Sequence, residues 1–172
     1  DMLGATAVLT GEDVSSRPAH IAAADGYGAK AIVRPKTTEQ VAAILRLCHE
    51  IGQTVVPLGG NTGMAGGTMA TENDIALSLE RMQDIEQVDQ IGRIMIVQAG
   101  IPLQKVHERA EEFGLMFPLD LGARGSATIG GNIATNAGGN KVLRYGMMRE
   151  MILGLEVVLA DGTILSSLNK VI

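Results

Sequence analysis

Apolar residues recur along the chain at two spacings, and each spacing predicts a type of element. Short apolar runs of strand character stand between segments in which apolar residues return every three or four positions, as on one face of a helix. In the first half of the chain this pattern predicts a strand over 31–34, a helix from Thr37 or Thr38 to about Glu50, and strands over 54–58 and 74–79. The helix stops at Gly52, and a glycine-rich stretch separates the last two strands.

The second half of the chain continues the same mixture. It predicts two strands joined as a hairpin, 85–88 and 93–99, then a helix from Pro102 to about Glu112, and a strand over 155–159. Asp161-Gly162 follows that strand and is the strongest hairpin-type turn signal in the sequence. We find neither an internal repeat nor a linker between domains.

Composition narrows the class of protein. With 172 residues and 46% apolar content, the chain is long and apolar enough to bury a core. No apolar run approaches the roughly 18 to 20 residues of a transmembrane helix. A net charge of −5, two Tyr, two Phe and no Trp leave few aromatic platforms for stacking bases. We therefore expect neither a transmembrane segment nor a nucleic-acid partner.

The single cysteine and the start of the sequence bear on the cellular compartment. Cys48 cannot form an internal disulfide, and the apolar residues around it favour a buried small side chain over a reactive thiol. The sequence begins at Asp1, and no basic stretch followed by an apolar run precedes the first expected element. We expect a cytoplasmic protein, or one from which a targeting leader has been trimmed.

Glycine is concentrated in two windows. Of the 22 glycines, five lie between residues 58 and 67 and six between residues 122 and 139. These windows interleave Gly with Asn, Thr, Met and Ile without repetition, unlike a flexible linker. Glycine lets a ligand approach the backbone closely, and its entropic cost makes such clustering hard to explain by turns alone. We interpret the windows as two specific loops.

The first window, PLGGNTGMAGG over residues 57–67, follows a predicted strand. Consecutive backbone N–H groups in a tight glycine turn form an anion-binding concavity, and Asn61 and Thr62 add side-chain donors at its centre. A pyrophosphate fits such a loop. The alternative is a wide turn that binds no ligand.

The second window, residues 118–140, is small and polar almost throughout. A backbone without large side chains can lie against a flat ligand and donate several hydrogen bonds to its edges, which suits a large polycyclic cofactor. The alternative is a small-residue helix packed closely on a neighbour, which accounts for Ala134 and Ala137 but not for the glycine pairs.

Two other phosphate-binding motifs are excluded. Residues 26–31 match the letters of the dinucleotide fingerprint G-x-G-x-x-A, but these glycines precede a strand, whereas the fingerprint follows a strand and opens a helix. The sequence contains no Gly-Lys dipeptide and therefore no Walker-type P-loop.

Three segments together resemble a known family. PLGGNTGMAGG, PLDLGARGSATIGGNIATNAGGNKVLRYG and GLEVVLADG occur in the order and spacing of the PCMH-type FAD-binding domain of vanillyl-alcohol-oxidase flavoproteins, in the branch that acts on D-2-hydroxy acids. The resemblance runs from about Ala31 to Gly162. It implies an α+β fold of two small lobes with FAD between them. The implied organisation is an N-terminal segment over 1–30 and an FAD-binding domain over 31–172, C-terminally truncated, because family chains are longer and continue into a substrate-binding cap.

The resemblance also implies which residues bind the cofactor. Those implied to wrap the FAD pyrophosphate are Pro57, Gly59, Gly60, Asn61, Thr62, Gly63, Met64 and Gly67. Those implied to line the ribityl chain and the flavin are Pro118, Leu119, Gly122, Gly125, Ser126, Ile129, Gly130, Gly131, Thr135, Asn136, Gly138, Gly139, Tyr145 and Gly146. In relatives that bond FAD covalently, a His or Cys commonly lies in or beside these loops. Both loops lack both residue types, so the resemblance implies non-covalent FAD.

The implied activity is oxidation of a D-2-hydroxy acid, such as 2-hydroxyglutarate, lactate or glycolate, to the 2-oxo acid by hydride transfer to the flavin. No catalytic residue is assigned within the sequence. Of the three histidines, His49 and His107 lie in predicted helices, where a solvated or capping role is favoured over catalysis, and the set with His20 lacks metal-ligand spacing.

Three arginines lie close to the second window in the sequence. For Arg124, Arg144 and Arg149, a surface role is favoured over contact with a phosphate or a substrate carboxylate.

One alternative function is a flavin reductase that uses a nicotinamide donor on the same fold. Another is a non-catalytic module that binds a nucleotide or phosphate without redox chemistry.

Overall fold

The computed structural model describes residues 3–19 and 25–168 of the chain. They form two compact units, and the chain enters each unit more than once. The first unit comprises the residues up to Leu58, Gly63–Arg81 and the residues from Leu153 on, and the second comprises Gly59–Thr62 and Met82–Ile152. Both units contain helices and strands, as the predicted α+β class requires.

A four-stranded sheet organises the first unit. Its strands in spatial order are β1 (Val8–Leu9), β2 (Ala31–Val33), β4 (Ile75–Ser78) and β3 (Val55–Leu58), with β1 antiparallel to β2 and the other pairs parallel. Ile32 and Ala76 are register partners, and both are fully buried. The three strands predicted in this half are confirmed. β1 is a two-residue strand, too short for an alternating pattern to mark it in the sequence.

The residues before β2 contribute to the same unit. After the 3₁₀ turn η1 (Ala5–Ala7) and β1, the short helix α1 (Glu12–Ser15) places Val14 in a hydrophobic cluster with Tyr27 and Ile32. The glycines of residues 26–31 precede β2 and open no helix, which agrees with the exclusion of the dinucleotide fingerprint.

The helix α2 (Thr38–Glu50) matches its prediction closely. Thr37 is the N-cap, and its side chain accepts a hydrogen bond from the Gln40 N–H at 3.3 Å. The prediction that Cys48 is buried is confirmed, since it packs on the inner face of this helix with 5% of its surface exposed. Among the described residues, no helix combines the length and the apolar character needed to cross a bilayer.

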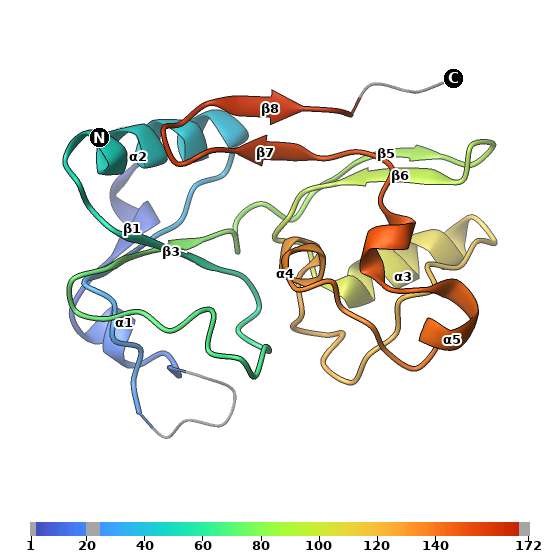
Figure 1. The fold of residues 1–172 in the computed structure, drawn as a ribbon, viewed down its shortest axis with the longest axis horizontal. Coiled ribbons are helices and arrows are strands. Elements are labelled where there is room, and N and C mark those ends of the chain that lie inside the picture. The colour runs from blue at the N-terminus through green and yellow to red at the C-terminus, as the bar shows by residue number, and fades with distance from the viewer. Residues whose placement is uncertain (1–2, 20–24, 169–172) are drawn as a thin grey trace. The chain divides into compact units, whose positions relative to one another are not determined.

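The last described elements of the first unit are a hairpin, β7 (Glu156–Val158) and β8 (Ile164–Ser166), seen side by side in Figure 1. Gly162 in the predicted turn has φ +82°, and a Cβ added to it would lie 2.5 Å from the Ala42 carbonyl oxygen of α2. Both facts require glycine at this position. β8 was not predicted because its three residues are exposed and carry no alternating pattern.

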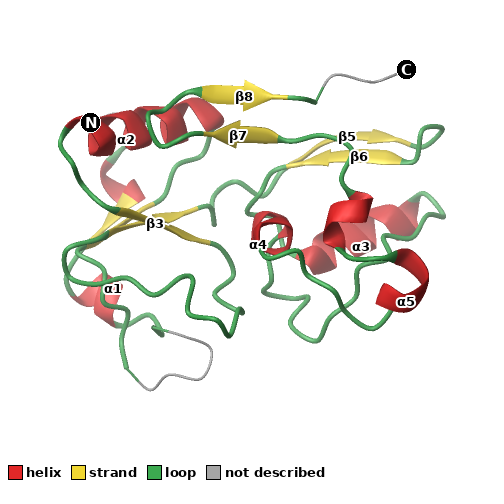
Figure 2. Ribbon diagram, viewed as in Figure 1, coloured by secondary structure: helices red, strands yellow, loops and turns green. Residues whose placement is uncertain are grey.

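The second unit packs a hairpin and several helices on one core. The predicted strands appear as β5 (Ile85–Asp89) and β6 (Ile94–Val97), which pair antiparallel, and the predicted helix as α3 (Leu103–Glu112) (Figure 2). Its core consists of Ile101, Leu103, Val106, Leu119, Ile129 and Met148. Pro102 is the N-cap of α3 rather than a residue of its first turn, and Gly114, with φ +66°, follows its end.

The second glycine window departs from its prediction. We interpreted it as a loop, but it contains the helix α4 (Ile129–Ala134), and α5 (Val142–Tyr145) and the 3₁₀ turn η2 (Met148–Met151) follow (Figure 2). The small-residue helix that we held as the alternative therefore forms part of this window. It includes Gly130, where an added Cβ would lie 2.9 Å from the Ala99 carbonyl oxygen, too close for a side chain. An added Cβ on Gly131 would lie 3.2 Å from Thr128 Oγ1.

Candidate cofactor site

The two glycine windows meet inside the second unit. A Cβ added to Gly60 would lie 1.9 Å from the Ser126 carbonyl oxygen, and one added to Gly59 would lie 2.7 Å from Thr128 Oγ1. Real Cβ atoms essentially never approach other heavy atoms this closely. We call the packing of Gly59 and Gly60 on residues 126–131 the glycine contact. It shows that these glycines serve close packing between segments that are more than 60 residues apart in sequence.

The start of α4 is also bonded to the segment that follows β6, at Ala99 and Ile101. A Cβ added to Gly130 would lie 2.9 Å from the Ala99 carbonyl oxygen, which accepts a hydrogen bond from the Gly130 N–H at 2.8 Å. Ile129 donates a second backbone bond, to Ile101, at 3.0 Å. Thr128 caps the helix, since its side chain accepts from the Gly131 N–H. The start of α4 is thus held rigidly against the glycine contact.

The first window also carries a run of unused backbone donors. The N–H groups of Thr62, Gly63 and Met64 donate no hydrogen bond to any described residue. Asn61, directly before them, has φ +53°, a left-handed conformation that turns the chain. Successive N–H groups beside such a turn form an anion-binding concavity. The local backbone therefore has the features that the sequence predicted for a pyrophosphate loop.

The two ends of the second window are tied to each other. Asp120 O accepts a hydrogen bond from the Asn140 N–H at 2.9 Å, and a Cβ added to Gly139, where φ is +116°, would lie 2.1 Å from the same oxygen. Asn136 also has a left-handed backbone, with φ +49°, and its Oδ1 accepts from the Arg149 N–H at 3.0 Å. These contacts close residues 118–140 into one compact segment around α4.

The structure distributes the predicted site residues unevenly over the two units. Those in the second unit are Gly59, Gly60, Asn61, Thr62, Pro118, Leu119, Gly122, Gly125, Ser126, Ile129, Gly130, Gly131, Thr135, Asn136, Gly138, Gly139, Tyr145 and Gly146. Those in the first unit are Pro57, Gly63, Met64 and Gly67. Leu119 and Ile129 belong to the hydrophobic core, so their side chains stabilise the fold and only their backbone is available to a ligand.

The charged residues near the second window have ordinary surface partners. Arg124 and Lys141 lie 3.4 Å and 3.8 Å from the carboxylate of Asp120, and the exposed guanidinium of Arg144 stacks on Tyr145 at 5.2 Å. Arg149 is also exposed. This agrees with the surface role favoured from the sequence.

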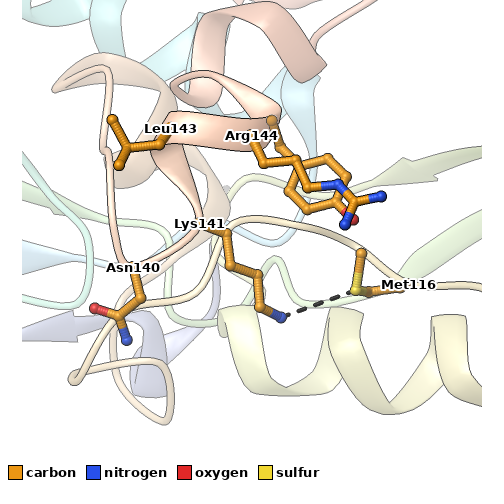
Figure 3. Close-up of a pocket in the computed structure, with 6 residues that line it drawn as sticks. Met116, Asn140, Lys141, Leu143 and Arg144 are labelled. Atoms are coloured by element: carbon orange, nitrogen blue, oxygen red, sulfur yellow. Dashed lines mark hydrogen bonds between the residues drawn. The ribbon is translucent and has the colours of Figure 1, made fainter.

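A hollow of about 330 Å³ lies beside this group of residues. It is lined by Met116, Asn140, Lys141, Leu143, Arg144 and Tyr145, and the Lys141 ammonium donates to the Met116 sulfur at 3.8 Å (Figure 3). Tyr145 is the predicted cofactor residue that borders this hollow.

Neither of the two described histidines belongs to a cluster that could hold a metal ion. His107 Nε2 lies 2.6 Å from the Leu119 carbonyl oxygen, and His49 is exposed in the last turn of α2. His20 lies outside the described residues. Within residues 3–19 and 25–168, no three His, Cys, Asp or Glu side chains gather in an arrangement that could hold a metal ion.

Two observations test whether these residues fit a bound nucleotide cofactor. The glycine contact and the run of free N–H groups provide backbone that a phosphate can approach. In addition, Asn132 on α4 is 5% exposed, and its Nδ2 has no hydrogen-bond partner among the described residues. The burial of Asn132 could not be predicted, because one asparagine in a segment rich in small polar residues carries no signal of burial. Both observations fit a polar ligand at α4.

Comparison with known proteins identifies that ligand's class. Residues 29–167 match the family described as FAD binding domain. The chain belongs to this family. FAD is accordingly the cofactor of the domain, and the resemblance noted in the sequence is confirmed.

Relatives of this FAD-binding domain are dehydrogenases. The mitochondrial D-2-hydroxyglutarate dehydrogenase of Bos taurus is 50% identical over 141 residues, which cover 82% of this chain and 26% of the relative. The D-lactate dehydrogenase of Archaeoglobus fulgidus is 45% identical over 141 residues, which cover 82% of this chain and 31% of the relative. The chain thus spans about a quarter to a third of the length of these relatives.

Solved structures show the same fold at low identity. Alkyldihydroxyacetonephosphate synthase superposes with a TM-score of 0.85 at 19% identity, over 95% of this chain and 32% of that protein. p-Cresol methylhydroxylase superposes with a TM-score of 0.76 at 22% identity, over 96% of this chain and 33% of that protein. The predicted PCMH-type α+β fold of the FAD-binding domain is therefore confirmed.

Proposed function

We propose that this chain is the FAD-holding part of a dehydrogenase that oxidises a D-2-hydroxy acid to the 2-oxo acid. The observation that carries the proposal is the 45–50% identity to D-lactate and D-2-hydroxyglutarate dehydrogenases over about four fifths of this chain. The glycine contact supports it, because it lies within the matched region.

The reaction removes a hydride from the α-carbon of the substrate and a proton from its hydroxyl group, leaving the 2-oxo acid. When bound, FAD supplies the ring that accepts the hydride. The residues of this chain bind and orient that cofactor. The free N–H groups of Thr62, Gly63 and Met64 are suited to donate to its pyrophosphate, and the backbone around Gly122 and Gly125 is suited to lie against its flat part.

The proposal includes the predicted domain organisation. Residues 1–30 are the N-terminal segment, residues 31–172 are the FAD-binding domain, and the substrate-binding cap belongs to the part of the relatives that this chain does not match. The low share of the relatives' length that the chain covers supports this division. The proton-accepting base and the cations that hold the substrate carboxylate are assigned to that same unmatched part.

Non-covalent attachment is also part of the proposal. Residues 57–67 and 118–146 contain neither His nor Cys, the residue types that commonly bond the flavin in covalent relatives. Denaturing the FAD-loaded protein and separating precipitate from supernatant tests this directly. All flavin is expected in the supernatant, and flavin that stays with the precipitated chain would contradict non-covalent binding.

An absorption spectrum tests the cofactor assignment. Purified chain is incubated with FAD and desalted, and flavin bands at about one FAD per chain are expected. Tight binding of ADP without retained flavin would instead support a non-catalytic nucleotide-binding module.

A second measurement tests the reaction. The loaded chain, joined to the cap segment of a relative, is mixed anaerobically with the D and L isomers of 2-hydroxyglutarate and of lactate, and with glycolate, which is achiral. Bleaching by a D isomer alone supports the proposal. If a nicotinamide donor bleaches the flavin and none of the hydroxy acids does, the result would favour a flavin reductase.

The names of the relatives differ in whether they state a cellular compartment. The bovine relative is named as mitochondrial, whereas the archaeal one carries no such word. We keep the prediction of a cytoplasmic location, with a trimmed leader as its alternative, and fractionation of the source cells decides between the two.

A further inference from the structure

The helix α4 presents different neighbours on different sides. Ile129 is a core residue of the second unit and Ile133 packs against that core, whereas Gly131 lies 3.9 Å from a Cβ added to Gly59 across the glycine contact. Successive residues of an α-helix are rotated by roughly 100° about its axis. Asn132 therefore lies at the border between the face that packs on the core and the face that meets the first glycine window.

This border residue has an unusual side chain for its burial. Asn132 is 5% exposed, and its Nδ2 donates to no described residue. Nearly all buried polar groups in folded proteins are hydrogen-bonded, because an unpaired donor loses its water without gaining a partner. Its backbone, in contrast, is fully used, since Asn132 N–H donates to Thr128 O and Asn132 O accepts from Ala137 N–H.

Asn132 differs from the other buried side chain that has an unpaired donor. The other buried donor without a partner in the described residues is Arg34 Nε, and that guanidinium already donates through its other nitrogens to Glu80 and to the Thr6 carbonyl. The Asn132 amide has no such compensation. An apolar residue of the same size would pack there without loss, so the amide indicates a partner that is not a part of the folded chain.

We propose that Asn132 is a cofactor-binding residue, whose Nδ2 donates a hydrogen bond to an acceptor atom of the bound FAD. The inference rests on the proposed function of the chain as the FAD-holding part of a dehydrogenase. The side chain comes from the element that meets the pyrophosphate loop, and it supplies the donor that a carbonyl, ribityl or phosphate oxygen needs.

The test compares stability and affinity in the same variants of the 172-residue chain. Asn132→Leu removes the donor and keeps the number and branching of the side-chain heavy atoms. Because the donor is unpaired in the protein, the thermal midpoint of the FAD-free variant is expected to stay equal to wild type or to rise. The Kd for FAD, measured by quenching of flavin fluorescence, is expected to increase about tenfold. The matched control is Ile133→Val, which trims the adjacent core residue, lowers the midpoint and leaves the Kd within about twofold.

Two smaller probes locate the acceptor. If Asn132→Leu weakens ADP and FAD equally, the acceptor lies in the nucleotide half. If it weakens FAD and riboflavin but not ADP, the acceptor lies in the flavin half, and the flavin absorption bands shift as well. Either result supports the inference.

Other outcomes overturn it. An Asn132→Leu chain with a lowered midpoint and an unchanged Kd would show that the amide is structural and satisfied by water. If that variant does not fold, the side-chain NH₂ group of Asn132 is followed by NMR in the wild-type chain. Its signals are assigned by their loss in Asn132→Ser. Signals that do not move when FAD is added contradict a hydrogen bond to the cofactor. Absence of FAD from the wild-type chain even when it is joined to the cap segment of a relative refutes the proposed function itself, whereas normal FAD binding by Asn132→Leu refutes the role of Asn132 alone.

Discussion

The carbonyl oxygen of Ser126 occupies the space in which a side chain on Gly60 would begin. A Cβ built on Gly60 lies 1.9 Å from that oxygen and 2.7 Å from its carbonyl carbon. The neighbour is backbone and cannot rotate away, so only a shift of a whole segment could make room. The first glycine window is therefore held in place by the second, and both would move if this contact opened.

Gly60→Ala is expected to lower the free energy of unfolding by about 1–3 kcal/mol, the usual cost of overpacking a close contact, and to abolish FAD retention. Urea unfolding of the FAD-free chain and a flavin spectrum after desalting measure the two effects. Gly63→Ala is the matched control for stability, because a Cβ there meets nothing within 4 Å among the described residues. Equal stability of the two variants would contradict the close packing at Gly60.

Gly122→Ala is expected to separate stability from affinity. A Cβ at Gly122 meets no described atom within 4 Å, and φ at this residue is not positive, so the free energy of unfolding should change by less than about 0.5 kcal/mol. If the flavin lies against this backbone as proposed, the added methyl group raises the Kd for FAD by about tenfold or more. The same pair of measurements checks it, and an unchanged Kd would remove Gly122 from the site.

The elements with a strong local signal were predictable from sequence. The helix α2 has a polar cap at Thr37 and apolar residues at helical spacing, and its bounds in the structure, Thr38–Glu50, agree with the prediction. The turn at Gly162 was equally clear, because a left-handed backbone and contact with α2 both select glycine there. In these cases neighbouring residues alone determine the conformation.

The second window was only partly predictable, because its helix depends on distant residues. Glycine is unfavourable in a helix, so the pair Gly130-Gly131 argued for a loop. In the fold, Ala99 lies so close to Gly130 that a side chain there would not fit, and an added Cβ on Gly131 would lie 3.2 Å from Thr128 Oγ1. The burial of Asn132 follows from the same tertiary contacts, and no local pattern could have indicated it.

Tyr27→Phe tests how the end of the first glycine window is held within its own unit. Tyr27 Oη donates to the Thr68 carbonyl oxygen at 2.6 Å, and burial, followed by the charge of Asp74, raises the pKa of this phenol, so it remains a donor at neutral pH. Removing the hydroxyl is expected to cost about 1 kcal/mol and to speed hydrogen exchange in residues 66–70. Tyr145→Phe serves as control, since its hydroxyl donates to no described residue. Unchanged exchange in both variants would contradict the anchoring role of Tyr27.

Glu80 forms the charged cluster of the first unit. Its carboxylate accepts from Arg17 Nη1 at 2.6 Å and Nη2 at 3.1 Å, and from Arg34 Nη1 at 2.9 Å. The hydrogen bonds from Arg17, then those from Arg34 and the charges of both, outweigh partial burial and lower the pKa of Glu80 from 4.5 to about 2. Because the carboxylate is favoured in the folded state, the cluster stabilises the protein wherever Glu80 is ionised in both states.

Glu80→Gln should therefore destabilise the chain in a pH-dependent way. Above pH 4.5 the full contribution is present, and the variant is expected to lose about 1–2 kcal/mol at pH 7, a value reduced because these side chains are about a third exposed and partly screened by water. As pH falls from 4.5 towards 2, the unfolded state gains a proton first and the difference between wild type and variant shrinks. Urea unfolding at pH 7, 5, 4 and 3 measures this difference, with the exposed Glu86 of β5 changed to Gln as the control. A difference that stays constant from pH 7 to 3 would show that Glu80 contributes through packing alone and that its charge is not what the arginines stabilise.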